Sequence, residues 1–213
     1  MLKCNVEGRE SAEPSSTLFL FTFLTAAAQC FCEESEMDGK IEQMALAAGF
    51  THVADLRAQD IVLMKDVRDM CAKNSCGMYG KNWSCPPACG TIEECRERVM
   101  AFQTGILVQT VGELEDEFDV ETMMETEAAH KEHFLQLHDA LQPLYPGLLS
   151  LGAGTCTRCS VCSYPDLPCR FPEKRFSSME AYGMLVTQVC QISGMKYYYG
   201  SGTISYTSCF LLE

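Results

Sequence analysis

The sequence has few basic residues and no long apolar segment. Lysine and arginine together number 16 against 29 aspartates and glutamates, and the formal net charge is -13. Nucleic acids and anionic lipid surfaces bind basic surfaces, so this shortage of positive charge argues against both as partners. The longest apolar run, residues 18–28, is too short to span a bilayer. We therefore expect no nucleic-acid binding and no stable membrane insertion.

Familiar catalytic motifs are also missing from the chain. It contains no Walker loop, no G-x-G-x-x-G after a predicted strand, no H-E-x-x-H and no G-x-S-x-G. Glu127 and His130 form one E-x-x-H pair, but a di-iron site in a helix bundle needs a second such pair, and none is present. We therefore expect His130 and His133 to lie on a solvated polar face. The sequence assigns no reaction.

Cysteine, in contrast, is abundant, with 14 in 213 residues. Five cysteines lie within residues 71–95 and four within residues 156–169, and the segment between these groups has none. Thiolates that hold a metal must converge on one centre, whereas a disulfide framework more often spreads its cysteines along the chain. The clustering therefore favours metal sites, in a chain whose composition is otherwise that of a globular protein.

The second cysteine group has the more specific spacing, Cys156-x2-Cys159-x2-Cys162-x6-Cys169. It resembles the ligand run of bacterial 4Fe–4S ferredoxins, although the last gap is longer and Arg170 stands where proline follows in ferredoxins. A zinc site usually pairs two Cys-x2-Cys knuckles across a longer span, and cysteines three apart rarely form a disulfide without strain. The spacing favours a 4Fe–4S cluster over zinc. Beside this group, basic side chains could offset the charge of thiolate-ligated iron, or bind an anionic substrate or partner: Arg170, Lys174 and Arg175.

The first cysteine group offers more thiols than one centre needs. Its members are Cys71, Cys76, Cys85, Cys89 and Cys95. Their spacing by itself does not identify a metal. Thr91 and Glu94 form a capping-box pattern, which predicts a helix whose first turn contains Cys95. The start of a helix lowers the pKa of a thiol and so favours the thiolate that a metal binds.

The pattern of apolar residues predicts an α/β fold, with a mixed sheet flanked by helices and two cysteine-rich metal-binding loops. We expect helices over 38–49, 91–102 and 177–194, the last with Ser177 as its N-cap, and a long helix that ends before Pro143. Strands are expected over 51–56, 60–63, 104–111 and 148–151, with a hairpin or two adjacent strands within 196–212. The loop 71–90 is rich in glycine and proline and is expected to be irregular.

The first 36 residues differ from the rest of the chain. We interpret residues 1–36 as an N-terminal extension, either the product of a misplaced start or a weak signal-like segment, because Met37 opens a more regular sequence. Residues 37–213 are expected to form a single cysteine-rich metal-binding domain. Thiolate clusters are hard to keep in an oxidising compartment, so we expect a cytoplasmic protein.

Two segments resemble an uncharacterised cysteine-rich family described as predicted metal-binding proteins, a domain of unknown function found mainly in anaerobic bacteria and archaea. One is Cys76-Gly-Met-Tyr79-Gly80-Lys-Asn-Trp83-Ser-Cys85-Pro86-Pro87, with Cys71 before it and Glu94-Cys95-Arg96 after it. The other is Cys162-Ser-Tyr164-Pro165, with Cys156 and Cys159 before it and Pro168-Cys169-Arg170 after it. The resemblance covers residues 37–213 and implies that Cys71, Cys76, Cys85 and Cys95 are ligands and that Cys89 is spare.

Taken together, these features predict a redox protein with two iron–sulfur clusters of the 4Fe–4S type. One cluster would be held by Cys71, Cys76, Cys85 and Cys95, and the other by Cys156, Cys159, Cys162 and Cys169. The protein would exchange electrons with a redox partner protein or serve as an accessory reductase in anaerobic metabolism. Two alternatives remain open: a zinc-binding structural or interaction module, and a thiol redox sensor that uses the same cysteines.

Overall fold

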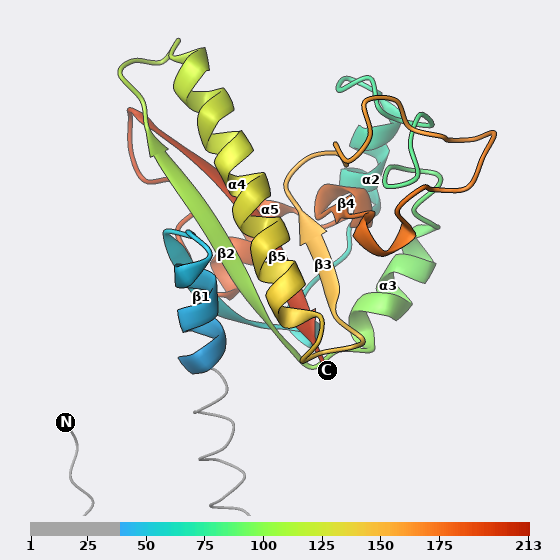
Figure 1. Ribbon diagram of the computed structural model, residues 1–213, viewed down its shortest axis with the longest axis horizontal. Coiled ribbons are helices and arrows are strands. Elements are labelled where there is room, and N and C mark those ends of the chain that lie inside the picture. Colours follow the sequence, from blue (N-terminus) through green and yellow to red (C-terminus); the bar gives the residue numbers. More distant parts are fainter. Residues whose placement is uncertain (1–38) are drawn as a thin grey trace, which may run out of the picture. The chain divides into compact units, whose positions relative to one another are not determined.

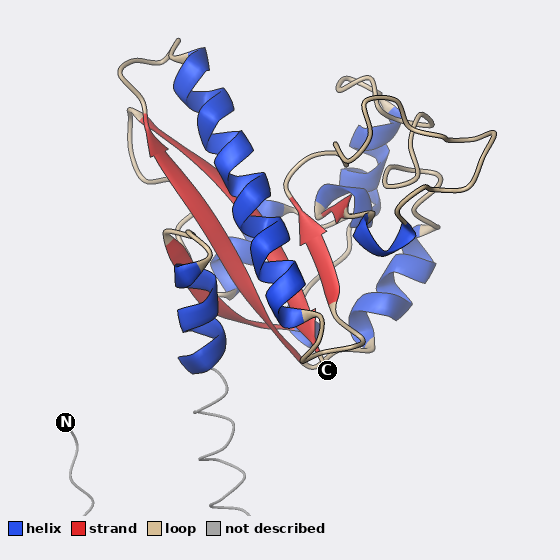
Figure 2. Ribbon diagram, in the orientation of Figure 1, coloured by secondary structure: helices blue, strands red, loops and turns tan. Residues whose placement is uncertain are grey.

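A five-stranded sheet forms the centre of the part of the chain that the structure describes (Figures 1 and 2). The computed structural model describes residues 39–213, of which residues 41–213 make one compact unit. The expected extension 1–36, and the boundary at residue 37, lie outside the described residues. No helix within 39–213 has the length and apolar character needed to cross a bilayer.

The sheet has the order β1-β2-β5-β3-β4. Its strands are β1 (His52–Arg57), β2 (Thr104–Glu113), β3 (Leu149–Gly152), β4 (Ser177–Ser178) and β5 (Thr203–Leu212). The pair β3–β4 is parallel and the other pairs are antiparallel, so the sheet is mixed, which confirms the expected fold class. The longest pairing joins β2 to β5, in register from Thr104 with Leu212 to Glu113 with Thr203.

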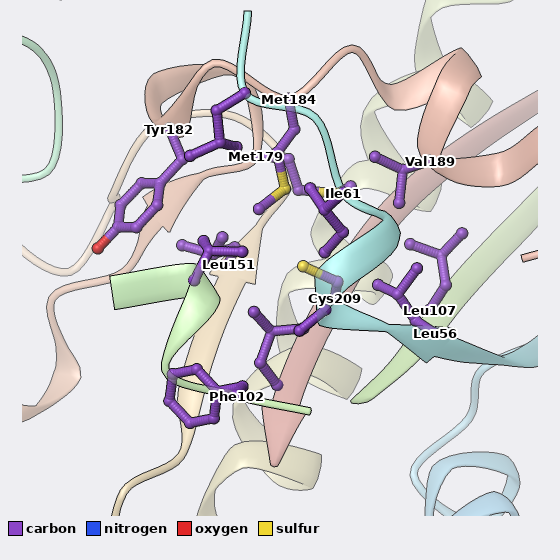
Figure 3. Packing of buried hydrophobic residues seen from close by; sticks show 14 of the residues in the cluster. Leu56, Ile61, Phe102, Leu107, Leu151, Met179, Tyr182, Met184, Val189 and Cys209 are labelled. Atoms are coloured by element: carbon purple, nitrogen blue, oxygen red, sulfur yellow. The ribbon is translucent and has the colours of Figure 1, made fainter. Parts of the chain in front are cut away.

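Both faces of the sheet are buried, because successive side chains of its central strands point into two different cores. On β2, Ile106 and Val108 pack with the helical residues 41–47 and with α4 (Val120–Leu141). Leu107 points to the opposite face and packs with α3 (Ile92–Met100) and α5 (Val186–Ile192) (Figure 3). Burial on both faces explains the continuous apolar runs 106–108 of β2 and 209–212 of β5.

The starts of α3 and α4 are set by local capping. The Thr91 side chain accepts a hydrogen bond from the Glu94 amide, and the Glu94 carboxylate accepts one from the Thr91 amide, which confirms the predicted capping box. Asp119 caps α4 by accepting from the Thr122 amide, so this helix begins inside the acidic segment. It ends at Leu141, before Pro143, as predicted.

Two predictions around residues 58–72 are wrong. The expected strand 60–63 is instead a 3-10 turn, η1 (Ala58–Asp60), followed by a single bridge between Leu63 and Met184. The helix α2 (Lys65–Ala72) was not predicted, and it takes Cys71 out of the expected irregular loop. Val67, Met70 and Cys71 do follow helical spacing, but α2 has only eight residues, too few for sequence periodicity to identify it securely.

The single helix expected over 177–194 is also wrong, because tertiary pairing interrupts it. Ser177 belongs to the short strand β4, and a 3-10 turn, η3 (Glu180–Tyr182), is separated from α5 by Gly183, whose φ is 90°. The Gly183 carbonyl accepts from the Met64 amide at 2.7 Å. A Cβ at Gly183 would lie 3.0 Å from the Met64 carbonyl oxygen, so this close crossing requires glycine.

The C-terminal strand and the histidines of α4 differ from expectation too. The structure forms no hairpin between 196–199 and the strand that follows; β5 pairs instead with β2 and β3.

His130 is 1% exposed, so the expected solvated face is wrong for this residue. Its two ring nitrogens contact hydroxyl oxygens, Thr110 Oγ1 at 3.0 Å and Ser208 Oγ at 2.7 Å, which explains how a polar ring is accommodated in the core.

Candidate metal centre

Two long irregular loops carry most of the predicted ligands. The first cysteine loop, residues 73–91, joins α2 to α3, and the second cysteine loop, residues 153–171, follows β3; neither contains helix or strand. In Figure 1 the two loops, drawn in teal to green and in orange, lie together beyond the sheet. All eight predicted ligands are free thiols in the structure: Cys71, Cys76, Cys85, Cys95, Cys156, Cys159, Cys162 and Cys169.

Side chains from the two loops bind each other directly. Asn82 Nδ2 donates to Thr155 Oγ1 at 2.7 Å, and the Cys85 sulfur lies 3.3 Å from the same hydroxyl oxygen. The Ser84 hydroxyl accepts from the Cys156 amide at 3.3 Å. Asn82 and Ser84 are fully buried and also hydrogen-bond to each other. These contacts fix one predicted ligand of each group, Cys85 and Cys156, beside the same few polar side chains.

An aromatic pair extends the contact between the loops. The indole Nε1 of Trp83 donates to the Leu167 carbonyl at 3.1 Å. Its ring meets that of Tyr164 edge to face, with 5.0 Å between the centroids. The single tryptophan of the chain therefore covers the second cysteine loop, where it reduces the access of water to the thiols nearby.

The four cysteines of the second group line one common pocket of about 20 Å³. Each of them is half-buried. Arg170 and Arg175 line the same pocket, so the predicted basic residues do lie beside these thiols. Lys174 also belongs to this region but is held by Asp139, with 2.9 Å between Nζ and the carboxylate oxygen.

The first cysteine group is divided between exposed and buried positions. Cys76 is exposed, Cys71 and Cys85 are half-buried, and Cys89 and Cys95 are buried. Cys71 ends up on α2 with its sulfur 3.9 Å from the Glu180 carbonyl, and burial raises the pKa of its thiol. The group therefore spans α2, the first cysteine loop and the start of α3.

Cys95 has the surroundings most favourable to a thiolate. It is fully buried in the first turns of α3, and the guanidinium of Arg68 lies 3.5 Å from its sulfur. A hydrogen bond from Cys89 and the charge and hydrogen bond of Arg68 hold the pKa of the Cys95 thiol below its usual range. Arg68 is itself fixed by the Ala181 carbonyl at 2.6 Å and by the Gly90 carbonyl.

Cys89 lies against Cys95 rather than apart from the site. The hydrogen bond between the two thiols, followed by burial, raises the pKa of Cys89, and its sulfur also lies 3.7 Å from the Ala181 carbonyl. Its own carbonyl accepts from Arg98 at 2.9 Å. Cys89 and Cys95 are therefore neighbouring buried thiols, and the Cys95 sulfur also lies 3.9 Å from the Cys89 carbonyl, to which it donates.

The donor set suits a soft metal, but the sulfurs are not gathered around a point. Among residues 39–213, no three histidine, cysteine, aspartate or glutamate side chains lie close enough together to hold a metal ion. Thiolates are the ligands of zinc and of iron–sulfur clusters. Metal binding at either group therefore requires the thiols to move together; six of the eight lie in the irregular cysteine loops, whereas Cys71 and Cys95 are held in α2 and α3.

Sequence reasoning missed the polar residues that organise these loops. Arg68 lies three positions before Cys71, but its role depends on the unpredicted helix α2. Asn82, Ser84 and Thr155 act across a separation of about seventy residues, for which a single sequence holds no signal. The local spacing of the second cysteine group was visible in the sequence, and its four members line one pocket; their role as ligands stays a prediction.

One protein family matches the chain. Its description is Predicted metal-binding protein (DUF2284), and the match covers residues 54–212. This range includes all eight predicted ligands and Cys89. The description names neither the metal nor a reaction. No curated protein and no solved structure matches the chain.

Proposed function

The chain belongs to the family of predicted metal-binding proteins (DUF2284), and on that premise we propose that it is an iron–sulfur redox protein with two 4Fe–4S clusters. One cluster is held by Cys71, Cys76, Cys85 and Cys95, and the other by Cys156, Cys159, Cys162 and Cys169. When bound, such clusters supply one-electron transfer. The role is electron transfer with a partner protein, or an accessory reductase role, in the cytoplasm of an anaerobe.

The observation that carries the proposal is the shared pocket of the second cysteine group. Four cysteines that lie within 14 residues of one another in the sequence line this one pocket. Three of them follow at intervals of three residues, which suits the corners of a cubane better than the paired knuckles of a zinc site. Arg170 and Arg175 place positive charge where four thiolates would collect negative charge.

The contact between the two cysteine loops supports two centres that work together. Cys85 and Cys156 belong to different predicted ligand sets, yet the Cys85 sulfur contacts the Thr155 hydroxyl and the Cys156 amide donates to the Ser84 hydroxyl, and Asn82 hydrogen-bonds to both Thr155 and Ser84. Electron transfer slows steeply with distance, so neighbouring centres can exchange electrons with each other. Trp83 and Tyr164 help to exclude water, which influences the potential of an iron–sulfur centre.

One observation favours zinc as a second candidate. The pocket of about 20 Å³ has space for little more than one water-sized group, for which about 10–15 Å³ suffices. A single tetrahedral ion fits such a space with less movement of the thiols than a cubane does. In that case the metal would stabilise an interaction module and carry no electrons.

The contact between Cys89 and Cys95 favours a third candidate, the thiol redox sensor. Two buried thiols that share a hydrogen bond, one with a lowered pKa, can form a disulfide when an oxidant is present. This use of Cys95 would compete with metal binding, because a disulfide sulfur is no longer a thiolate ligand.

Metal analysis of the full chain, purified without oxygen, distinguishes the three. The proposal expects about eight irons with matching sulfide, and broad absorbance near ~400 nm that bleaches on reduction. A colourless protein with about one zinc per cysteine group would overturn it in favour of the zinc module. A metal-free protein that forms a Cys89–Cys95 disulfide under mild oxidation would overturn it in favour of the sensor.

The ligand assignment has its own test in Cys89→Ser. Serine keeps a hydroxyl that can donate to Cys95, so the iron content should stay at the value of the unmodified chain. Cys95→Ser is the matched variant and should lose about half of the iron. Loss of iron in Cys89→Ser equal to that in Cys95→Ser would show that Cys89 is a ligand.

A further inference from the structure

A half-open cavity of about 170 Å³ lies where α4, β3 and the start of the second cysteine loop meet. Phe134, Leu135 and Phe176 give it a largely apolar lining. Three cationic side chains, Lys131, Arg158 and Lys174, line it as well. The combination of an apolar interior and a few positive groups is typical of a site for a small organic anion.

The cavity shares a wall with the pocket of the second cysteine group. Cys156 and Arg158 line both spaces. Gly152, the last residue of β3, also lines the cavity, and a Cβ there would lie 3.6 Å from the Phe134 ring. A molecule in the cavity would therefore contact the residues that border the predicted ligands, without having to displace either cysteine loop.

The three cations differ in how much of their charge is already compensated. Lys131 pairs with Glu127, and Lys174 lies 2.9 Å from the Asp139 carboxylate. Among residues 39–213, Arg158 forms no ion pair, and its guanidinium lies 5.8 Å from the centroid of the Phe171 ring. Its fork of donors matches one carboxylate in a bidentate arrangement.

The other polar side chains in the lining are the hydroxyls of Thr155 and Thr157 and the ring of His130, and none of them needs a charged ligand. His130 already uses both ring nitrogens on the hydroxyls of Thr110 and Ser208. The ligand is therefore expected to have one anionic group and otherwise apolar surface. A nucleotide does not fit, because its several phosphates would face mainly aromatic and aliphatic side chains and its volume exceeds the space available.

The size of the cavity limits the apolar part of the ligand. A dry cavity of about 150 Å³ is enough to bind benzene. We propose that this cavity binds a small organic monocarboxylate whose apolar body is about the size of one benzene ring. The carboxylate binds Arg158, and the body packs against Phe134 and Phe176. Binding itself does not depend on the metal; a role for the ligand as electron donor or acceptor rests on the proposed function.

Calorimetric titration of the full chain with three probes tests the proposal. Benzoate has both the ring and the charge, benzyl alcohol has the ring without the charge, and acetate has the charge without the ring. We expect benzoate to bind at least about tenfold more tightly than either of the others, because only benzoate satisfies both parts of the site. Equal affinities for the three probes, or no binding of benzoate, would overturn the proposal.

Variants assign the binding to this cavity. Arg158→Gln should weaken benzoate about tenfold and leave benzyl alcohol unchanged, since only the charge-assisted hydrogen bonds are lost. Ala153→Leu adds volume to the lining and should weaken both. Arg57→Gln removes a cation outside the cavity and should change neither. If Arg158→Gln fails to fold, Arg158→Lys is the substitute, with an expected loss of about threefold; an unchanged benzoate affinity in whichever variant folds overturns the proposal.

Metal content measured on the same preparations separates this inference from the proposed function. Benzoate binding that depends on Arg158, in a protein without iron, would support the site and overturn the iron–sulfur proposal. A protein that holds eight irons but does not bind benzoate would support the iron–sulfur proposal and overturn the proposed site.

Discussion

Replacing His130 with glutamine tests how the stability of this protein depends on pH. His130 is 1% exposed and packs edge to face against Phe50, with 5.4 Å between the ring centroids. Burial, and then the positive charges of His133 and Lys131, lowers its pKa to about 3. Glutamine keeps an amide that can reach the Thr110 and Ser208 hydroxyls but has no proton to gain in this range.

The sign of the effect follows from where the proton binds. The unfolded chain takes up a proton on this histidine near pH ~6.5, whereas the folded chain takes it up only near its lowered pKa. Inside this window the unfolded state holds more protons, so acid destabilises the fold by roughly 1.4 kcal/mol per pH unit. From about pH 7 to about pH 5 the loss due to His130 is about 2 kcal/mol.

Urea unfolding of both proteins at the two pH values measures this contribution. The free energy of unfolding falls for both chains, because other groups titrate and the metal sites lose thiolates in acid. These shared effects cancel when the two proteins are compared at the same pH. The amount by which the free energy of unfolding of His130→Gln falls below that of the unmodified chain should therefore be about 2 kcal/mol smaller at the lower pH. A difference that stays the same within about 0.5 kcal/mol would refute the reasoning.

Three other substitutions have definite expected results. Cys156→Ser should remove about half of the bound metal, because it takes one ligand from the second cysteine group, whereas Cys190→Ser, in the apolar core, should remove none; metal analysis of both decides. Arg68→Met should lower the free energy of unfolding by about 2 kcal/mol, since two carbonyls lose a charged donor, and urea titration measures this. Equal stability would show that water replaces the guanidinium. Gly49→Ala should cost at least about 1 kcal/mol, because φ at this position is 107° and the added Cβ would meet the His133 ring at 2.4 Å; an unchanged melting temperature would contradict this.

The parts of the fold that the sequence predicted are those encoded locally. The capping box at Thr91 and Glu94 lies within four residues, and the buried strand β2 is a continuous apolar run. The helix expected over 177–194 failed because its interruption at Gly183 depends on Met64, more than a hundred residues away. The strand β5 was expected, but its partners β2 and β3 were not, because pairing is decided across the whole sheet.

The same distinction applies to the candidate site. The four cysteines of the second group line one pocket, and they are close in sequence: two residues separate Cys156 from Cys159 and Cys159 from Cys162, and six residues separate Cys162 from Cys169. The first group draws on α2, a loop and α3, so its geometry depends on how these elements pack. The burial of His130 was missed for a related reason: its hydroxyl partners, Thr110 and Ser208, come from two different strands.

Thr155 has a position whose consequence goes beyond holding two loops together. Its hydroxyl oxygen accepts from Asn82 and lies 3.3 Å from the sulfur of Cys85, its chain neighbour is Cys156, and its side chain lines the 170 Å³ cavity. Thr155 therefore borders the first cysteine group, the second cysteine group and the cavity. A molecule that enters the cavity and turns this hydroxyl changes the hydrogen bonding of a sulfur in the other cysteine group, so occupancy of the cavity is communicated to a centre it does not touch.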